Sequence, residues 1–212
     1  DVLWTPLQRR LIDVMPGESF TFRFKATDAG VFMYHCGTKP VLAHSANGMY
    51  GAIVVDPVPA LPKVDREYVL VAGEWYLSND GVAEPATLDM DKARAMMPDW
   101  TAFNGYAGQY VAHPLTSDPG DTVRFYVVDA GPSLTTAFHV VGTIFDTVYP
   151  NGDMNPEHVQ NGVQTVDVPA GGGAVFEVKI DEPGLYPFVS HAFAHGDLGQ
   201  VGGKDHGAQR RK

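Results

Sequence analysis

The sequence has 212 residues, of which 44% are hydrophobic and 19% charged, and its formal net charge is −10. This acidic balance argues against a protein that binds a nucleic-acid backbone through a basic face, and the apolar content excludes a disordered chain. No apolar run approaches the roughly 18–20 residues of a membrane-spanning helix, and the first residues lack the ordered regions of a signal peptide. We therefore expect one large or two small globular domains with no membrane span.

Short apolar runs rich in β-branched and aromatic residues follow one another along the chain, bounded by turn sequences such as PGE, DAG, DPGD and EPG. Such runs are typical of strands in a sandwich or barrel. Only 86–99 favours a short helix or irregular excursion, because it is rich in Ala and Met and stops at Pro98. The sequence therefore predicts an all-β fold. The expected strands lie at about 19–26, 51–56, 67–77, 121–130, 137–149, 173–180 and 185–191.

Two segments of the chain resemble each other at an offset of 154 residues, one beginning at Gly17 and the other at Gly171. Phe22 then aligns with Phe176 and Gly30 with Gly184. Each copy has the pattern of a strand, a glycine turn and a second strand that runs into a histidine. A repeat of this kind predicts two domains of one fold, the alternative being two hairpins that are alike by chance.

The repeat also predicts how the chain is divided. About a hundred residues of strand-like sequence precede the second copy within its domain, but only sixteen precede the first, so we expect the first domain to lack its N-terminal half. The proline-rich stretch 56–65 is the expected boundary. The predicted units are a first domain at 1–57, a second at 64–203 and a mobile tail without an apolar pattern at 204–212.

The segment that carries chemistry runs from Tyr34 to Gly51 and contains the one cysteine of the chain. Cys36 is followed by His44 eight residues on and by Met49 five residues further. A thiolate, an imidazole and a weak thioether suit an electron-transfer copper of the type 1 class, because the soft sulfur ligands hold Cu(I) and the imidazole also serves Cu(II). Zinc is less favoured because there is no second cysteine.

His35 stands directly before Cys36, and adjacent strand residues point to opposite faces. If Cys36 faces one copper, His35 faces away from it and can bind a second metal, connected to the first through two residues of backbone. For His35 alone the alternative is an ordinary surface histidine, and for Met49 it is core filling.

The motifs YHC, NGMYGAIVVDP and LPKVDREYVLVAGEWY closely resemble copper-containing nitrite reductases and the related multicopper oxidases. In the second domain FNGYAG, FHVVGTIFDTVYPNG, VQTVDVPAGGGAVFEVKIDEPGLY and VSHAF resemble the same family, so that the likeness covers about residues 15–203. The resemblance implies two cupredoxin-like Greek-key β-barrels, a homotrimer with a type 2 copper between subunits, and reduction of nitrite to nitric oxide with electrons from a donor protein. It also implies a periplasmic or cell-surface location.

The resemblance assigns roles to residues at matching positions. Cys36, His44 and Met49 would bind type 1 copper. His35 would bind type 2 copper, together with His191 of a neighbouring subunit.

A histidine of the second domain would manage protons near the type 2 copper, and His139 matches best, with a structural histidine as the alternative. Asp1 would be the remnant of an aspartate that delivers protons. His195 is a weaker candidate for a copper neighbour. The remaining histidines read as surface residues: His113, His158 and His206.

The sequence departs from the family at one element. The family has a His-x-x-Asp-x-His element before the PGE strand, but no histidine precedes His35 here and Leu3 stands in the place of the last one. Each copper would therefore lack one histidine ligand from within this chain.

Two other functions stay open. A laccase-like oxidase that reduces O₂ needs His-x-His pairs, yet none of the eight histidines forms one, and Val141 stands two residues after His139. An electron carrier with type 1 copper alone needs only one barrel, which the repeat and His191 argue against. A copper count per chain would distinguish all three functions.

Overall fold

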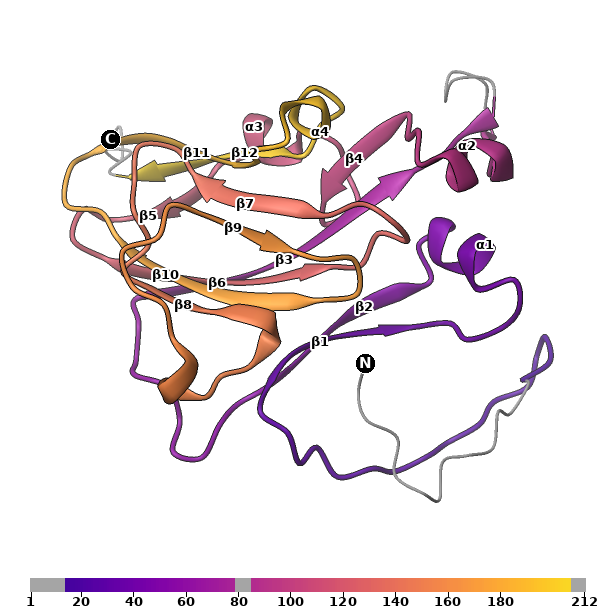
Figure 1. Ribbon diagram of the computed structural model, residues 1–212, viewed down its shortest axis with the longest axis horizontal. Helices are drawn as coiled ribbons and strands as arrows, with labels where there is room; N and C mark the ends of the chain where they lie inside the picture. Colours follow the sequence, from indigo (N-terminus) through magenta and orange to yellow (C-terminus); the bar gives the residue numbers. More distant parts are fainter. Residues whose placement is uncertain (1–13, 79–84, 207–212) are drawn as a thin grey trace.

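The computed structural model of the protein describes residues 14–78 and 85–206, and two packed β-sheets dominate it (Figure 1). Antiparallel pairing prevails, with β3 parallel to β6 and β5 parallel to β12. The all-β prediction is confirmed. One sheet has the order β4 (Trp100–Phe103), β3 (Arg66–Trp75), β6 (Thr122–Asp129), β10 (Gly173–Lys179) and β8 (Thr147–Tyr149). The other has the order β5 (Leu115–Ser117), β12 (Val201–His206), β11 (Gly184–Ser190), β7 (Thr136–Val140) and β9 (Thr165–Val168).

A cluster of phenylalanines fills the space between the two sheets. Phe138 lies at its centre, with ring centroids 4.8 Å from Phe176 and 5.7 Å from Phe125. Each fully buried side chain of this size contributes about 1.5–3 kcal/mol relative to an exposed one. The inward-facing side chains of the two sheets therefore form one hydrophobic core.

A separate hairpin, β1 (Gly30–His35) with β2 (Tyr50–Val55), lies against the outer face of the first sheet (Figure 1). Val31 and Met33 pack there against Tyr126 and Val128 of β6. The alternate residues of β6 face the interior of the sandwich, so β6 is buried on both faces. The molecule therefore has three layers, which are the hairpin, the first sheet and the second sheet.

The predicted helix within 86–99 is confirmed as α2 (Met90–Ala95). The Asp89 side chain accepts hydrogen bonds from the backbone N–H groups of residues 91 and 92, which caps the first turn. Met96 adopts a left-handed conformation and ends the helix before Pro98.

Short helical turns lie in the connecting segments, where the sequence did not predict them. Each has three to six residues, too few for a periodic apolar pattern. They are α1 (Val41–Ala46), α3 (Gln109–Ala112), α4 (Phe193–Asp197) and the 3₁₀ turns η3 (Pro150–Gly152) and η4 (Pro156–His158). No helix in the described part of the chain is long and apolar enough to span a membrane.

The predicted strand at 19–26 is not formed. Phe20, Phe22 and Phe24 alternate as in a strand and stack on one another, but all three are exposed. The second copy of the repeat shows the physical reason, because β10 is held between β6 and β8. Among the described residues no strand pairs with 19–26, and a strand requires a hydrogen-bonding neighbour.

The strand β12 was not among the predicted strands, and it extends into the predicted tail. The second domain was expected to end at 203, but β12 continues to residue 206 and pairs there with both β11 and β5. Backbone hydrogen bonds on both sides hold these last residues in the sheet, although their side chains lack an apolar pattern. The rest of the predicted tail, 207–212, lies outside the described residues.

Hydrogen bonds attach the proline-rich stretch 56–65 to the sandwich, between Asp65 and Thr122 and through the buried side chain of Arg124. Arg124, on β6, donates to the carbonyl oxygen of Pro62 at 2.6 Å and to Glu177 at 2.6 Å and 2.8 Å. A further bond of 2.7 Å joins it to Glu67. Arg124 therefore fixes the chain between the hairpin and the sandwich, and a domain boundary in this stretch stays a prediction.

Candidate copper sites

The loop between β1 and β2 brings three predicted ligands to one end of the hairpin. The backbone N–H of Cys36 donates to the carbonyl oxygen of Met49 at 3.0 Å, and the N–H of Met49 donates to the carbonyl oxygen of His44 at 3.2 Å. His44 lies on α1, inside this loop. The hydrogen bonds close the loop on itself, so the residues of the Cys–His–Met pattern share one small region of the surface.

The thiol of Cys36 is suited to a metal. The backbone N–H of Thr38 lies 3.5 Å from Sγ, and side-chain and backbone hydrogen bonds from Thr38 lower the pKa of the thiol. The thiolate is the form that binds metals. Cys36 is partly exposed and Met49 is 51% exposed, so both residues lie at the surface of the protein.

His35 is exposed at the end of β1, and its ring is oriented by its own chain. Nδ1 lies 2.9 Å from the carbonyl oxygen of Cys36. Because a carbonyl oxygen only accepts hydrogen bonds, Nδ1 carries the proton and Nε2 holds the lone pair that a metal would bind.

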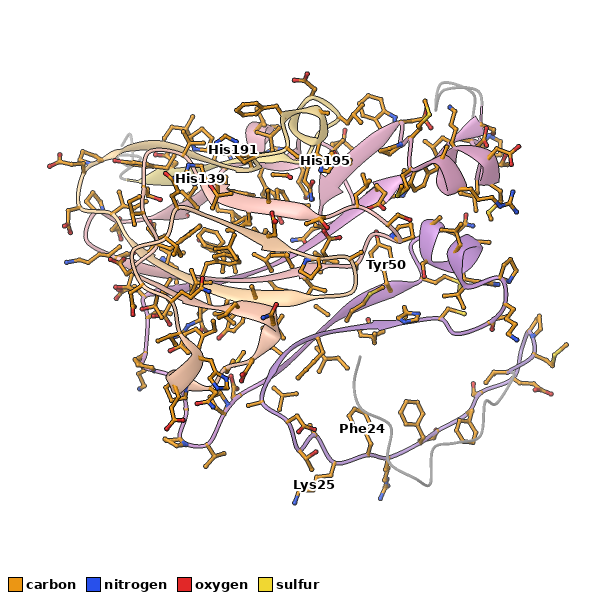
Figure 2. All side chains as sticks on the ribbon, in the orientation of Figure 1. Phe24, Lys25, Tyr50, His139, His191 and His195 are labelled. Carbon is orange, nitrogen blue, oxygen red and sulfur yellow. The ribbon has the colours of Figure 1, made fainter. Side chains whose placement is uncertain are left out.

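A second pair of histidines lies on the other sheet. His139, on β7, and His191, directly after β11, have ring centroids 5.4 Å apart (Figure 2). The backbone N–H of His191 donates to the carbonyl oxygen of Ala137 at 2.7 Å, which extends the pairing of β7 with β11. His139 Nδ1 lies 2.5 Å from the carbonyl oxygen of Gln164, so its Nε2 also holds a lone pair. His139 is 9% exposed, whereas His191 is exposed.

Within one chain the two groups of donors lie on opposite sides of the sandwich. The hairpin covers the outer face of the first sheet. On β7 the neighbours Phe138 and Val140 face the interior, so His139 faces the outer side of the second sheet. Tyr50 pairs with His35 in the hairpin and lies well apart from His139 and His191 in Figure 2.

The donor types at both places fit copper, although each place is short of a full ligand set. In the part of the chain that the structure describes, no three His, Cys, Asp or Glu side chains gather as a metal site. A copper site on Cys36 and His44 would therefore need the thioether of Met49 or a further donor, and a copper site on His191 would need donors from elsewhere. Thiolate, imidazole and thioether are ligands that copper accepts.

Comparison with known proteins establishes the family. The model of the family described as multicopper oxidase matches residues 2–59 and 82–203. The chain belongs to the multicopper oxidase family. A curated relative in this family, the copper-containing nitrite reductase of Neisseria gonorrhoeae, is 45% identical over 192 residues, which are 88% of this chain and 48% of the relative.

Solved structures of the multicopper oxidase family agree. The copper nitrite reductase from Nitrosomonas europaea is 33% identical with a TM-score of 0.85, covering 97% of this chain and 72% of that one. A copper-containing nitrite reductase from Thermus scotoductus is 32% identical with a TM-score of 0.81, covering 91% of this chain and 45% of that one. These likenesses confirm the fold of cupredoxin-like barrels, of which the first is represented here by the hairpin. The chain spans about half the length of the curated relatives it matches.

The other candidate residues of this multicopper oxidase chain take different places. His195, on α4, contacts the hydroxyl of Ser190 at 3.4 Å, and burial lowers its pKa. His113 and His158 are exposed as expected, and His158 pairs with Asp153 at 2.6 Å. Asp1 lies outside the described residues, so its predicted role in proton delivery is not placed.

Two buried carboxylates were not predicted from the sequence. Glu74 is 3% exposed and Asp129 2% exposed, and they lie at the ends of β3 and β6, where Asp129 is opposite Ala72. One oxygen of Asp129, Oδ2, is buried without a hydrogen-bond partner among the described residues. Their one sequence signal is an acidic residue inside an apolar run, at EYVLVAGEWYL and DTVRFYVVDA.

Replacing Asp129 with asparagine should change how stability depends on pH. Burial, and then the negative charge of Glu74, raise the pKa of Asp129 to about 8. The folded protein therefore binds this proton more tightly than the unfolded chain, whose aspartates titrate near pH 4. The wild-type free energy of unfolding should fall as the pH rises from about 4 to about 8, by about 1.4 kcal/mol per unit of pKa difference at most.

The measurement is urea unfolding of wild type and Asp129→Asn at several pH values. Asparagine has the same shape and cannot ionise, so the difference between the two proteins isolates Asp129 from the other titrating groups. Parallel stability curves from pH 5 to pH 8 would show that the raised pKa is wrong.

Proposed function

We propose that this member of the multicopper oxidase family takes part in the copper-dependent reduction of nitrite to nitric oxide. The observation that carries the proposal is the adjacency of His35 to Cys36, which connects an exposed imidazole through the backbone to the thiolate of the Cys–His–Met loop. The names of the similar proteins from Neisseria gonorrhoeae and Nitrosomonas europaea support the same substrate.

Two groups of side chains would hold copper. Cys36, His44 and Met49 would form the type 1 set, and His35 would bind a type 2 copper through Nε2. Copper bound at these places supplies one-electron transfer and a Lewis acid that orients nitrite. The Thr38 hydrogen bond keeps the thiol of Cys36 ready to ionise.

The reaction consumes one electron and two protons per nitrite, breaks one N–O bond and releases the departing oxygen as water. The chain must therefore hold a proton close to that oxygen. His139 is suited to this role because its Nδ1 is committed to Gln164, which leaves Nε2 to accept and return a proton. His139 is 9% exposed, so bulk water has limited access to the residue.

A complete type 2 site would need two copies of the chain. His35 and His191 lie on opposite sides of the sandwich, so one chain cannot bring them to the same metal ion. In a ring of identical subunits, the hairpin of one copy can meet the second sheet of the next. The exposed rings of His191 and Phe193, whose centroids are 4.8 Å apart, offer an apolar and metal-binding patch for that contact. We infer a homotrimer.

The assay that tests this function measures nitric oxide formed from nitrite by the copper-loaded protein with a chemical reductant. A parallel assay measures oxidation of phenols with O₂. The assayed protein should include a His-x-x-Asp-x-His element before the PGE strand, so that each copper has its full set of ligands. Nitric oxide formation with two coppers per chain is expected.

Other outcomes would change the proposal. Phenol oxidation with four coppers per chain and no reaction with nitrite would replace it by the oxidase function. One copper per chain and neither activity would indicate an electron carrier, which would leave His139 and His191 without a role.

A further inference from the structure

The copper loop rests on the end of strand β3. Leu42 and Ala46, on α1, pack against Tyr76, together with Ala93 of α2. Tyr76 is fully buried, with 0% exposure. Because α1 also carries His44, the position of this ligand depends on where the Tyr76 ring lies.

Glu74 holds the Tyr76 ring in place. The Tyr76 hydroxyl donates to Glu74 Oε1 at 3.1 Å, and the same oxygen accepts the backbone N–H groups of Ser133 at 2.9 Å and Leu134 at 3.1 Å. A buried carboxylate that accepts three hydrogen bonds has little freedom to turn. The ring under α1 is thereby fixed to the loop that follows β6.

The other side of the copper loop is held through Tyr50, the residue after Met49. Its side chain lies between the hairpin and the sandwich (Figure 2), and its hydroxyl reaches β3 at Gly73. A Cβ atom at Gly73 would collide with this hydroxyl oxygen. The backbone of Gly73 is not in the left-handed region, so glycine is needed there for space.

We propose that Gly73, Glu74 and Tyr76, the β3 seat, position the copper loop, setting Met49 through Tyr50 and His44 through Tyr76. The three are positioning residues and not ligands. The inference rests on the proposed function for the identity of the metal, but the geometry that it describes exists without the metal.

The first test needs no copper. In Gly73→Ala the new methyl group should push Tyr50 out of its position and loosen the residues beside it. The amides of Cys36 and Met49, both hydrogen-bonded in the loop, should then exchange with deuterium at least about tenfold faster than in wild type. The amide of Phe176, in the interior of the sandwich, should be unchanged.

A compensating change separates positioning from general damage. Tyr50→Phe removes the hydroxyl that meets the new methyl group, so the double variant Tyr50→Phe/Gly73→Ala should return the exchange rates to within about twofold of Tyr50→Phe alone. Tyr76→Phe tests the other side, because it keeps the ring and removes its bond to Glu74. It should speed exchange at Asn47, whose N–H bonds the carbonyl groups of Ala43 and His44.

The second test uses the copper-loaded protein. Gly73→Ala should shift the reduction potential of the thiolate copper, because the Met49 thioether would be displaced and this ligand tunes the potential. The double variant should restore the potential. If Gly73 contributed to stability alone, the reduction potential of the copper would be the same in Gly73→Ala and in wild type.

The inference is overturned if Gly73→Ala folds with unchanged loop exchange, or if the double variant does not restore it. If loop exchange responds as expected while wild type binds no copper, the β3 seat is supported and the proposed function fails. If wild type binds copper and reduces nitrite but neither exchange nor potential responds, the proposed function is supported and the inference fails.

Discussion

Replacing Cys36 with serine should abolish the visible absorption of the copper-loaded protein completely. The colour of a type 1 copper comes from charge transfer between the thiolate and Cu(II), and Cys36 is the one cysteine of the 212-residue chain. A serine hydroxyl does not ionise at neutral pH and cannot replace the thiolate. The measurement is the absorption spectrum of the oxidised protein together with its copper content.

Met49→Leu is the matched control for this experiment. Met49→Leu removes the second sulfur ligand from the same loop but leaves the thiolate. The visible absorption of the copper should therefore be retained, while the reduction potential of the copper should shift. Absorption that survives Cys36→Ser would contradict the assignment of Cys36 as a copper ligand.

Replacing His35 with alanine should reduce nitrite reduction to background while the thiolate absorption remains. The two effects are expected to separate because His35 ends β1 and Cys36 directly follows it, and side chains of adjacent residues in an extended chain point to opposite faces. The His35 ring bonds the carbonyl oxygen of Cys36. Replacing His35 with alanine therefore removes a metal ligand and one side-chain hydrogen bond, and it leaves the backbone hydrogen bonds of the strand in place. Nitric oxide formation, absorption and copper content are measured on the same sample.

His158→Ala is the control for the loss of an exposed histidine. His158 lies on η4 and pairs with Asp153 away from either group of donors, so its removal should leave nitrite reduction unchanged. If His35→Ala lost the absorption as well, the two residues would serve one metal ion and the two-site account would be wrong.

Much of the sandwich could be predicted from the sequence because its strands carry alternating or fully apolar patterns. Phe125 and Phe176 illustrate this, since both lie in apolar runs and both face the shared interior. The same pattern misled at Phe22, where the side chains alternate but the backbone has no partner strand in the described part of the chain. Residue pattern predicts the faces of a strand, whereas pairing depends on which other segments are present.

Cys36, His44 and Met49 could be proposed as ligands from residue type and spacing, because few residue types bind copper, whereas His191 was proposed from the family resemblance. The arrangement of the candidate residues in space could not be predicted in this way. That His139 and His191 come together follows from the register of β7 with β11, and pairing between distant strands is not encoded in local spacing. The same holds for Glu74, whose partners Ser133 and Leu134 are about sixty residues away in the sequence.

The most direct test of the central claim, that His35 of one copy and His191 of another complete one site, is complementation between two inactive variants. His35→Ala and His191→Ala should each lack nitrite reduction. When the two chains are co-expressed and assemble at random in a ring, about one quarter of the interfaces combine an intact His35 with an intact His191. The account predicts that the mixed protein regains about a quarter of the wild-type activity per chain. Activity that stays at background in a mixed assembly of confirmed composition would contradict it.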